Sequence, residues 1–214
     1  MRSLWLTRHG HTEHSDASTL NSELDRQVLL DETGREQARG LAAAVETEPP
    51  QVCFSSEFSR TRETAELIVE RIGPTVEPLR ALNEVAFGSW FERRTYQEYV
   101  EWCTEHGLFE TPPGEGGQPF ADTLLRLHSV FTDICARPEP VGLVVTHGFP
   151  VSFLRRMPAL VPGETLFPFP GAAPAELYRI DVHTALCGLA QVPERVKVAA
   201  EKTVDGRRWW EARQ

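Results

Sequence analysis

Two apolar segments of this chain are each followed, directly or after one residue, by a histidine and a glycine. One segment, residues 3–7 (SLWLT), lies just before Arg8 and His9, and the other, residues 141–146 (VGLVVT), lies just before His147. A short apolar run of this kind is typical of a buried strand. Because the carboxyl ends of parallel strands meet at one edge of a sheet, we expect the two histidines to lie close together.

The rest of the chain alternates between strand and helix patterns. Further strands are expected at residues 51–55 and 75–79, and helices at residues 31–48, 59–73, 94–105, 121–138 and 150–156. This alternation predicts an α/β fold, a three-layer sandwich with a mostly parallel central sheet flanked by helices. The polar residues 11–30 are expected to form a loop.

The C-terminal part has a different pattern. Residues 175–192 and 196–212 resemble C-terminal antiparallel strands joined in hairpins, with Asp205 and Gly206 as a turn. The length of 214 residues fits one domain, residues 1–214. Within it, the aromatic and charged stretch at about residues 81–122, with its Pro/Gly-rich end, is a candidate cap insertion.

Composition limits the partners and the setting. A formal net charge of −9 argues against a nucleic-acid partner, because phosphate backbones require clustered Lys and Arg. A small phosphorylated substrate needs only a few local positive groups. No apolar run of about eighteen residues is present, so no membrane partner is expected. The start of the chain turns polar after a few residues. With four widely spaced cysteines, this predicts reduced thiols and a cytoplasmic protein (Cys53, Cys103, Cys135, Cys187).

Several polar residues near the strand ends suit an anionic ligand. Arg8 can hold phosphate oxygens in bidentate fashion, and Thr12 can donate a hydroxyl hydrogen bond. Arg60 and Arg62 lie early in an expected helix, where the helix dipole disfavours cations, so they suggest a bound anion. For Arg62 a solvated side chain is the preferred interpretation. Glu84 lies among apolar neighbours, which raise a carboxyl pKa toward that of a general acid.

A metal site built from His9, His11 and His14 is a minor alternative. The spacing of these histidines fits neither one face of a helix nor one face of a strand. No second cluster of ligand residues accompanies them. We therefore expect no metal and no cofactor.

Taken in order along the chain, these motifs resemble the histidine phosphatase superfamily, also called phosphoglycerate mutase-like proteins. The resemblance spans Leu4 to about Leu154, and residues 31–42 are similar to the family's first helix. The motifs that carry it are Arg8-His9-Gly10 with Thr12, the pair Ser55-Ser56 before Arg60, Glu84 in LNE, and His147-Gly148.

The resemblance implies a role for each residue. His9 would be the nucleophile that forms a phosphohistidine, and Glu84 would protonate the leaving oxygen and then activate water. Arg8, Arg60 and His147 would surround the phosphoryl group and stabilise its charge. Thr12, Ser15 and Gly148 would complete the phosphate-binding site. Positioning and charge stabilisation are what phosphoryl transfer mainly requires.

The chain departs from the family pattern at three places. Many members have Trp-Asn shortly after the threonine, where this chain has His14-Ser15. Members often have Trp-Glu-Gly after the catalytic glutamate, where residues 90–93 read WFER. A small residue often follows the second His-Gly, where this chain has Phe149. These departures concern the identity of the substrate and not the core chemistry.

The expected function is therefore hydrolysis of a small phosphate ester by a phosphomonoesterase. A cofactor-dependent phosphoglycerate mutase-type phosphotransferase is the first alternative, but residues 81–122 are short for the insert of such enzymes. A non-catalytic phospho-ligand-binding protein would typically lack His9 or Glu84, and both are present. A homodimer and residual mutase activity are left open.

The residues of the candidate cap have two interpretations each. Arg93 and Arg94 either contact a second anionic group of the substrate or decorate a solvated helix face, and the second interpretation is preferred. Four aromatic residues either line a pocket or pack in the core (Trp90, Phe91, Tyr96, Trp102).

Overall fold

A single mixed sheet organises the chain, and its order brings the two histidine-bearing strands together. The computed structural model describes residues 1–17, 19–21, 27–92, 94–160 and 172–204, with residues 16–17 and 199–204 described by their backbone alone. The strands it contains have the order β3-β2-β4-β1-β5. They are β1 (Ser3–Arg8), β2 (Val52–Ser55), β3 (Val76–Pro78), β4 (Val141–Thr146) and β5 (Leu177–Asp181).

Strands β1 to β4 are parallel, and β5 runs antiparallel to β1 at the edge. In the register of β1 and β4, Arg8 lies opposite Thr146. The ladder continues one residue further, because the backbone N–H of His9 donates to the carbonyl of Thr146 over 2.9 Å. The predicted meeting of the two strand ends is therefore confirmed.

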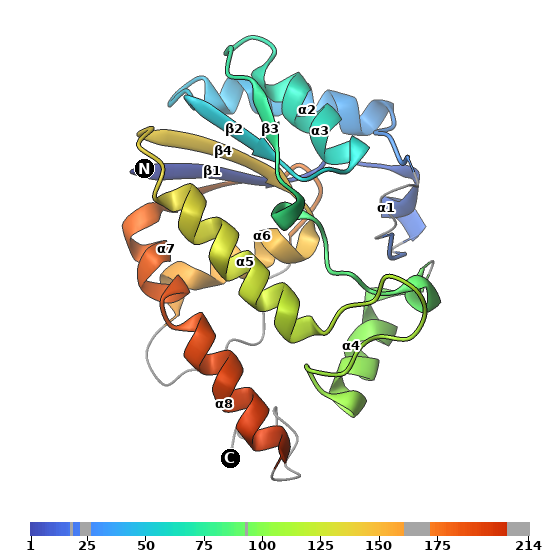
Figure 1. Cartoon of the computed structure of the whole chain (residues 1–214). Coiled ribbons are helices and arrows are strands. Elements are labelled where there is room, and N and C mark those ends of the chain that lie inside the picture. Colours follow the sequence, from blue (N-terminus) through green and yellow to red (C-terminus); the bar gives the residue numbers. More distant parts are fainter. Residues whose placement is uncertain (18, 22–26, 93, 161–171, 205–214) are drawn as a thin grey trace.

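Helices cover both faces of the sheet (Figure 1). Helices α2 (Glu32–Val45) and α3 (Ser59–Val69) lie on one face, and α5 (Phe120–Cys135), α6 (Gly148–Arg156) and α7 (Val182–Leu189) on the other. Each side has its own core because side chains alternate along a strand. Leu143 and Val145 belong to the core beneath α2 and α3, whereas Val144 belongs to the larger core on the other side. The predicted three-layer α/β sandwich is confirmed.

The remaining elements lie around this sandwich. They are α1 (Glu13–Ala17), α4 (Tyr96–His106), α8 (Val192–Val204), which packs on α5, and 3₁₀ turns at Arg80–Leu82, Ser89–Phe91 and Met157–Ala159. Helix α4 stands apart from the sheet (Figure 1). Its start is fixed by Thr95 and Glu98, which form a capping box. That the segment around α4 forms a cap over the substrate stays a prediction.

The C-terminal hairpins predicted from the sequence are wrong, apart from strand β5. Residues after Asp181 form α7 and α8 instead. The buried residues Val182, Ala185 and Leu189 recur at helical spacing, and the Asp181 side chain accepts a hydrogen bond from the Thr184 N–H as an N-cap. Val182, Val192 and Val196 face the core from these helices. The expected turn at residues 205–206 lies outside the described residues.

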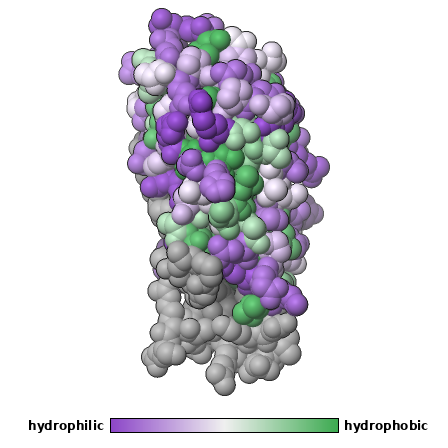
Figure 2. All heavy atoms as spheres, turned by 90° about the vertical axis from the view of Figure 1, so that its left-hand side faces the viewer, coloured by the Kyte–Doolittle hydropathy of each residue, from purple (hydrophilic) through white to green (hydrophobic). Residues whose placement is uncertain are grey.

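One further correction concerns residues 11–30, which were expected to form a loop but include the short helix α1. The surface is largely hydrophilic on the face shown in Figure 2, where hydrophobic residues gather near the middle. In the described part of the chain, no helix combines the length and the apolar character that a membrane span requires.

Two glycines hold the loop after β1 against α2. A Cβ atom on Gly10 would lie 2.5 Å from the carbonyl oxygen of Gly34, and a Cβ on Gly34 would lie 2.2 Å from the carbonyl oxygen of His11. Both obstacles are backbone atoms, which cannot swing aside as a flexible side chain can. The close approach therefore fixes the backbone position of His9.

A pair of alanine substitutions in α2 tests this contact. Gly34→Ala is expected to destabilise the fold by about 1–3 kcal/mol, because the new methyl group overlaps the loop backbone. Gly40→Ala is the matched control, since a Cβ there meets nothing within 4 Å. It should stabilise the fold by up to about 1 kcal/mol through helix propensity. Urea unfolding measures both, and a Gly34→Ala protein as stable as the wild type would contradict the close approach.

Candidate active site

The predicted site residues meet in one small cavity at the carboxyl ends of β1 and β4. The cavity has a volume of about 80 Å³ and is lined by Arg8, His9, Thr12, His14, Ser15, Thr19, Leu20, Asn21, Val28, Arg60, Glu84, Phe87 and His147. Gly148 lies at its wall, where a Cβ would be 3.7 Å from Arg8 Nε and 3.8 Å from Glu84 Oε2. The structure therefore brings all the predicted site residues together.

The imidazole of His9 is held with one nitrogen available as a nucleophile. Its Nδ1 lies 2.8 Å from the carbonyl oxygen of Gly10. A carbonyl only accepts hydrogen bonds, so Nδ1 carries the proton and Nε2 carries the lone pair. Arg60 Nε donates to this Nε2 over 3.3 Å. Burial lowers the pKa of His9 well below its usual value, and the charges of Arg60 and Arg8 act in the same direction. The neutral ring is thus favoured.

His147 is oriented by a chain of hydrogen bonds. Arg60 Nη2 lies 3.3 Å from His147 Nδ1, and a guanidinium only donates, so Nδ1 is the acceptor. The other nitrogen, Nε2, therefore donates to the Ser56 hydroxyl over 2.8 Å. Ser56 in turn lies 2.6 Å from the hydroxyl of Thr61, which donates to the carbonyl of Phe58. The rings of His9 and His147 meet edge to face, with centroids 5.4 Å apart.

Arg60 lies at the centre of the site and is 96% buried. Besides the two histidines, it donates to the backbone carbonyl of Asn21 over 2.9 Å. Its guanidinium also lies over the ring of Phe58, 4.4 Å from the centroid. Burial lowers the pKa of Arg60 to about 10, so the side chain is still a cation at neutral pH. By contrast, Arg62 is exposed and does not line the cavity, as its preferred interpretation predicts.

Arg8 reaches the same cavity from the end of β1. Its Nη1 donates to the carbonyl of Ala172 over 3.1 Å, which fixes the direction of the guanidinium. Its Nε is buried and has no hydrogen-bond partner within the described ranges. Burial lowers the pKa of Arg8, and the nearby charge of Glu84 opposes this. The site thus contains a guanidinium N–H that is ready to donate.

Glu84 is the acidic group of the cavity. One carboxylate oxygen accepts from the N–H of Val85 over 3.0 Å and the other from the N–H of Phe149 over 3.4 Å. Burial raises the pKa of Glu84, whereas these N–H groups and the charges of Arg8 and Arg60 oppose the rise. A raised pKa is the direction that a proton donor near neutral pH requires.

The loop that carries Glu84 is held by Arg126, a residue that sequence reasoning missed. From α5, Nη1 donates to the carbonyls of Ala81 and Asn83 over 2.6 and 2.8 Å, and Nη2 donates to the carbonyl of Glu84 over 3.1 Å. Thr146 adds a fourth contact, from its hydroxyl to the carbonyl of Leu82 over 2.6 Å. The only signal in the sequence was one arginine within the largely apolar run LLRLHSVF.

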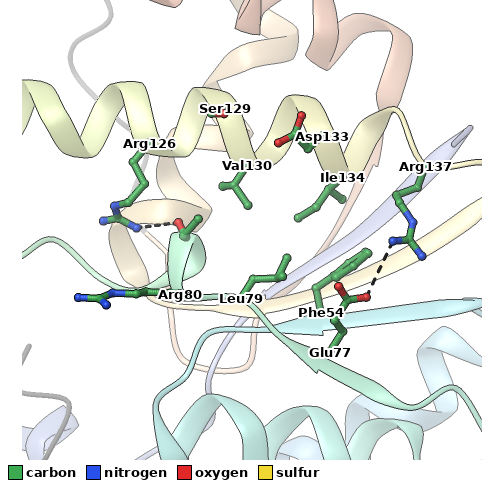
Figure 3. Close-up of a pocket in the computed structure, with 11 residues that line it drawn as sticks. Phe54, Glu77, Leu79, Arg80, Arg126, Ser129, Val130, Asp133, Ile134 and Arg137 are labelled. Atoms are coloured by element: carbon green, nitrogen blue, oxygen red, sulfur yellow. Dashed lines mark hydrogen bonds and ion pairs between the residues drawn. The ribbon is translucent and has the colours of Figure 1, made fainter.

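Arg126 also lines a larger groove of about 570 Å³ (Figure 3). The groove lies between α5 and the segment after β3. Its remaining lining residues are Phe54, Glu77, Leu79, Arg80, Ala81, Ser129, Val130, Asp133, Ile134 and Arg137. It holds none of the predicted site residues. The smaller cavity is the better candidate for the functional site, because convergent polar groups mark a site better than volume does.

The polar residues after His9 have separate roles. The Ser15 hydroxyl accepts from the N–H of Thr12 over 3.1 Å and lies 3.3 Å from the Thr12 hydroxyl. His11 instead bonds through Nδ1 to Asp31 over 2.5 Å and does not line the cavity. Within the described residues, no group of three or more His, Cys, Asp or Glu side chains is arranged to hold a metal ion.

None of the described candidate residues of the expected cap lines the cavity, and Trp90 and Tyr96 are exposed. Arg94 lies 3.8 Å from the centroid of the Trp90 ring and donates to Glu98 over 2.9 Å, whereas Arg93 lies outside the described residues. Phe91 is fully buried in an aromatic cluster. The aromatic residue that does line the cavity is Phe87, which sequence reasoning had not singled out.

Comparison with known proteins agrees with this geometry. The family model described as histidine phosphatase superfamily (branch 1) matches residues 4–193. The chain belongs to this superfamily.

The individual proteins to which this chain is similar are named for different activities. The adenosylcobalamin/alpha-ribazole phosphatase of Salmonella typhimurium is 31% identical over 78% of this chain and 84% of its own length. A Photorhabdus laumondii protein named probable phosphoglycerate mutase GpmB is 31% identical over 72% of this chain and 73% of its own length. A solved mycobacterial glucosyl-3-phosphoglycerate phosphatase, complexed with VO3, has a TM-score of 0.68 at 23% identity, with 84% of this chain and 92% of that chain covered. This last likeness shows the shared histidine phosphatase fold.

The two buried histidines make stability depend on pH. Burial lowers the pKa of His9 and of His147 well below 6.5, whereas in the unfolded chain each binds a proton near pH 6.5. The unfolded state therefore binds more protons below that pH. Each histidine should lower the free energy of unfolding by up to about 1.4 kcal/mol for each pH unit between 6.5 and 5.

Single substitutions isolate this effect. The free energy of unfolding of His9→Gln and of His147→Gln should fall less steeply with acidification than that of the wild type. The slope of each variant should be smaller by up to about 1.4 kcal/mol per pH unit. Urea unfolding at several pH values between 5 and 7.5 gives the slopes. Wild-type slopes in both variants would show that the two rings are already protonated in the fold.

Proposed function

We propose that this protein is a phosphomonoesterase that hydrolyses a small phosphorylated metabolite through a phosphohistidine at His9. The observation that carries the proposal is that His9 Nε2 carries a lone pair rather than a proton and lies inside a cavity that also contains two guanidinium groups. A nucleophile fixed beside cations that neutralise phosphate charge suits phosphoryl transfer.

In the first step, His9 Nε2 attacks phosphorus and the bond from phosphorus to the ester oxygen breaks. Glu84 gives its proton to the departing alkoxide, which leaves as an alcohol. Arg8, Arg60 and His147 donate hydrogen bonds to the three phosphoryl oxygens as their charge develops. For this, His147 must gain a proton on Nδ1, and a bound dianion favours that proton.

In the second step, the deprotonated Glu84 accepts a proton from water. The water oxygen attacks phosphorus and the bond to His9 Nε2 breaks, which releases inorganic phosphate and regenerates the starting enzyme. Thr12, Ser15 and Gly148 belong to the phosphate-binding wall in this proposal. No step requires a metal or a cofactor.

The relatives support the class of substrate. The Salmonella relative is a phosphatase of a small metabolite ester, and the mycobacterial structure is that of another. The mutase-type alternative has support in the name of the Photorhabdus protein. The two activities differ in whether water reaches the phosphohistidine, so release of inorganic phosphate from one substrate alone separates them.

Partners and location follow the same proposal. A small-molecule phosphate ester is the partner in this proposal, without nucleic acid. A cytoplasmic location is supported by the free cysteines, of which Cys53, Cys103 and Cys135 are buried.

Replacing the nucleophile tests the proposal directly. His9→Ala should lower turnover by more than about a thousandfold, because the variant lacks the nitrogen that forms the bond to phosphorus. Acid-quenched wild-type protein should carry a phosphohistidine that this variant lacks. His183→Ala is the matched control, since His183 is an exposed histidine outside the cavity. A folded His9→Ala protein with substantial activity would overturn the proposal.

The role of Glu84 is tested by varying the leaving group. Glu84→Gln keeps the shape but cannot donate the proton, so hydrolysis of alkyl phosphates should slow by about a hundred- to ten-thousandfold. Formation of the phosphohistidine from p-nitrophenyl phosphate should slow far less, because p-nitrophenolate leaves without help. Arg60→Ala should impair both substrates together. Rapid-quench measurement of the first turnover separates the steps, and equal slowing of both substrates by Glu84→Gln would exclude it as the leaving-group acid.

A further inference from the structure

The carboxyl of Glu84 is carried by a segment that is neither helix nor strand, so its position depends on bonds from elsewhere in the fold. The segment, residues 83–88, lies between the 3₁₀ turns at Arg80–Leu82 and Ser89–Phe91. Proton transfer to a leaving oxygen requires hydrogen-bond geometry, and a displacement of about 1 Å can cost on the order of a hundredfold in rate. A side chain that holds this segment can therefore set the rate of the proposed first step.

Two side chains anchor the start of this segment to different parts of the fold. Asn83 bonds to Glu57, because its Nδ2 donates to the Glu57 carboxylate over 3.1 Å and its Oδ1 accepts from the Glu57 N–H over 3.0 Å. Arg126 binds the backbone instead, at the carbonyls of Ala81 and Asn83 over 2.6 and 2.8 Å and at the carbonyl of Glu84 over 3.1 Å. Arg126 is thus bonded to the very residue whose carboxyl must be placed.

The chemistry of the arginine side chain suits this task. A guanidinium is planar and rigid, so bonds from two of its nitrogens fix the orientation of the peptide units as well as their position. The side chain reaches the segment from α5, which packs against the 3₁₀ turn at Arg80–Leu82 (Figure 3). The position of Glu84 is thereby tied to a helix of the sandwich rather than to its own loop alone.

Arg126 lies close to the reacting groups without being one of them. Burial lowers the pKa of Arg126, and the nearby charge of Glu84 opposes this. The charge of Arg126 is also among the causes that lower the pKa of His147. The side chain does not line the cavity, however, so it is not placed to contact a phosphoryl group there. Any effect on the reaction must then be exerted through another residue.

We propose that Arg126 is a positioning residue for the leaving-group acid, because it holds the backbone of Glu84 where the carboxyl can reach the departing oxygen. This inference rests on the proposed phosphatase function. A residue that merely stabilised the fold would change the melting temperature and leave the relative rates of two substrates unchanged. A positioning residue for the acid slows the substrate that needs the proton and spares the one that does not.

The experiment measures the first turnover by rapid quench, with an alkyl phosphate and with p-nitrophenyl phosphate, well below the melting temperature of each variant. Arg126→Met keeps an unbranched stem but removes the donors, so phosphohistidine formation from the alkyl phosphate should slow about 10- to 100-fold more than that from p-nitrophenyl phosphate. Arg137→Met is the matched control, since Arg137 lines the same groove but bonds to Glu139, and the ratio of its two rates should equal that of the wild type.

A second variant covers the case in which Arg126→Met does not fold. Arg126→Lys keeps the stem and the charge, but a single nitrogen cannot span the carbonyls that the guanidinium holds. It should therefore slow the alkyl phosphate selectively as well, by at least about threefold. Circular dichroism checks that each variant folds.

The double variant Arg126→Met with Glu84→Gln shows whether the two residues act as a unit. If Arg126 acts through the proton of Glu84, the double variant should react with the alkyl phosphate within about threefold of Glu84→Gln alone, because effects in one pathway do not add. Multiplied effects, or folded Arg126 variants that keep the wild-type ratio of the two rates, would overturn the role of Arg126. A wild type that forms no phosphohistidine and hydrolyses no phosphate ester would instead refute the phosphatase function.

Discussion

The rest of the site depends on the burial of one cation, the guanidinium of Arg60. Removing a charge from water is costly unless hydrogen bonds replace the water. None of the hydrogen bonds that Arg60 makes in the described part of the chain is to a carboxylate. Its acceptors are the neutral ring nitrogens of His9 and His147 and the oxygens of Asn21. The charge is therefore hydrogen-bonded to neutral acceptors rather than paired directly with a carboxylate, although the nearby charge of Glu84 favours the cation. An anion that enters the cavity can pair with it.

The same low-dielectric surroundings set the protonation of the other groups in directions that catalysis needs. Burial favours the neutral form of every group, so it lowers the pKa of His9 and raises that of Glu84. A neutral imidazole has the lone pair for attack, and a protonated carboxyl has the proton for the leaving oxygen. Burial therefore prepares both the nucleophile and the acid. It does so although histidine becomes positive, and glutamate negative, when it ionises.

The predictable part of the structure was the part specified by local pattern. Two apolar runs that each end in His-Gly were sufficient to predict parallel strands and adjacent histidines. The C-terminal helices were missed because Val182, Val192 and Val196 were interpreted by their strand propensity, whereas burial at helical spacing decided their conformation. Arg126 and Asn21 could not be predicted, because their roles arise from contacts with residues that are distant in sequence. Their residue types alone carry no such signal.

The placement of Asn21 also shows how the two halves of the site are joined. The neighbouring N–H of Leu20 donates to the carbonyl of Arg94 over 2.8 Å, and Thr19 forms an antiparallel bridge with Thr95. Thr95 is the N-cap of α4, so the loop that reaches the phosphate cavity is paired directly with the start of that helix. The segment before α4 includes one of the departures from the family pattern, residues 90–93, whereas Arg60, which Asn21 contacts, belongs to the shared motifs. Substitutions near the start of α4 can therefore reach the cavity through the loop that contacts Arg60.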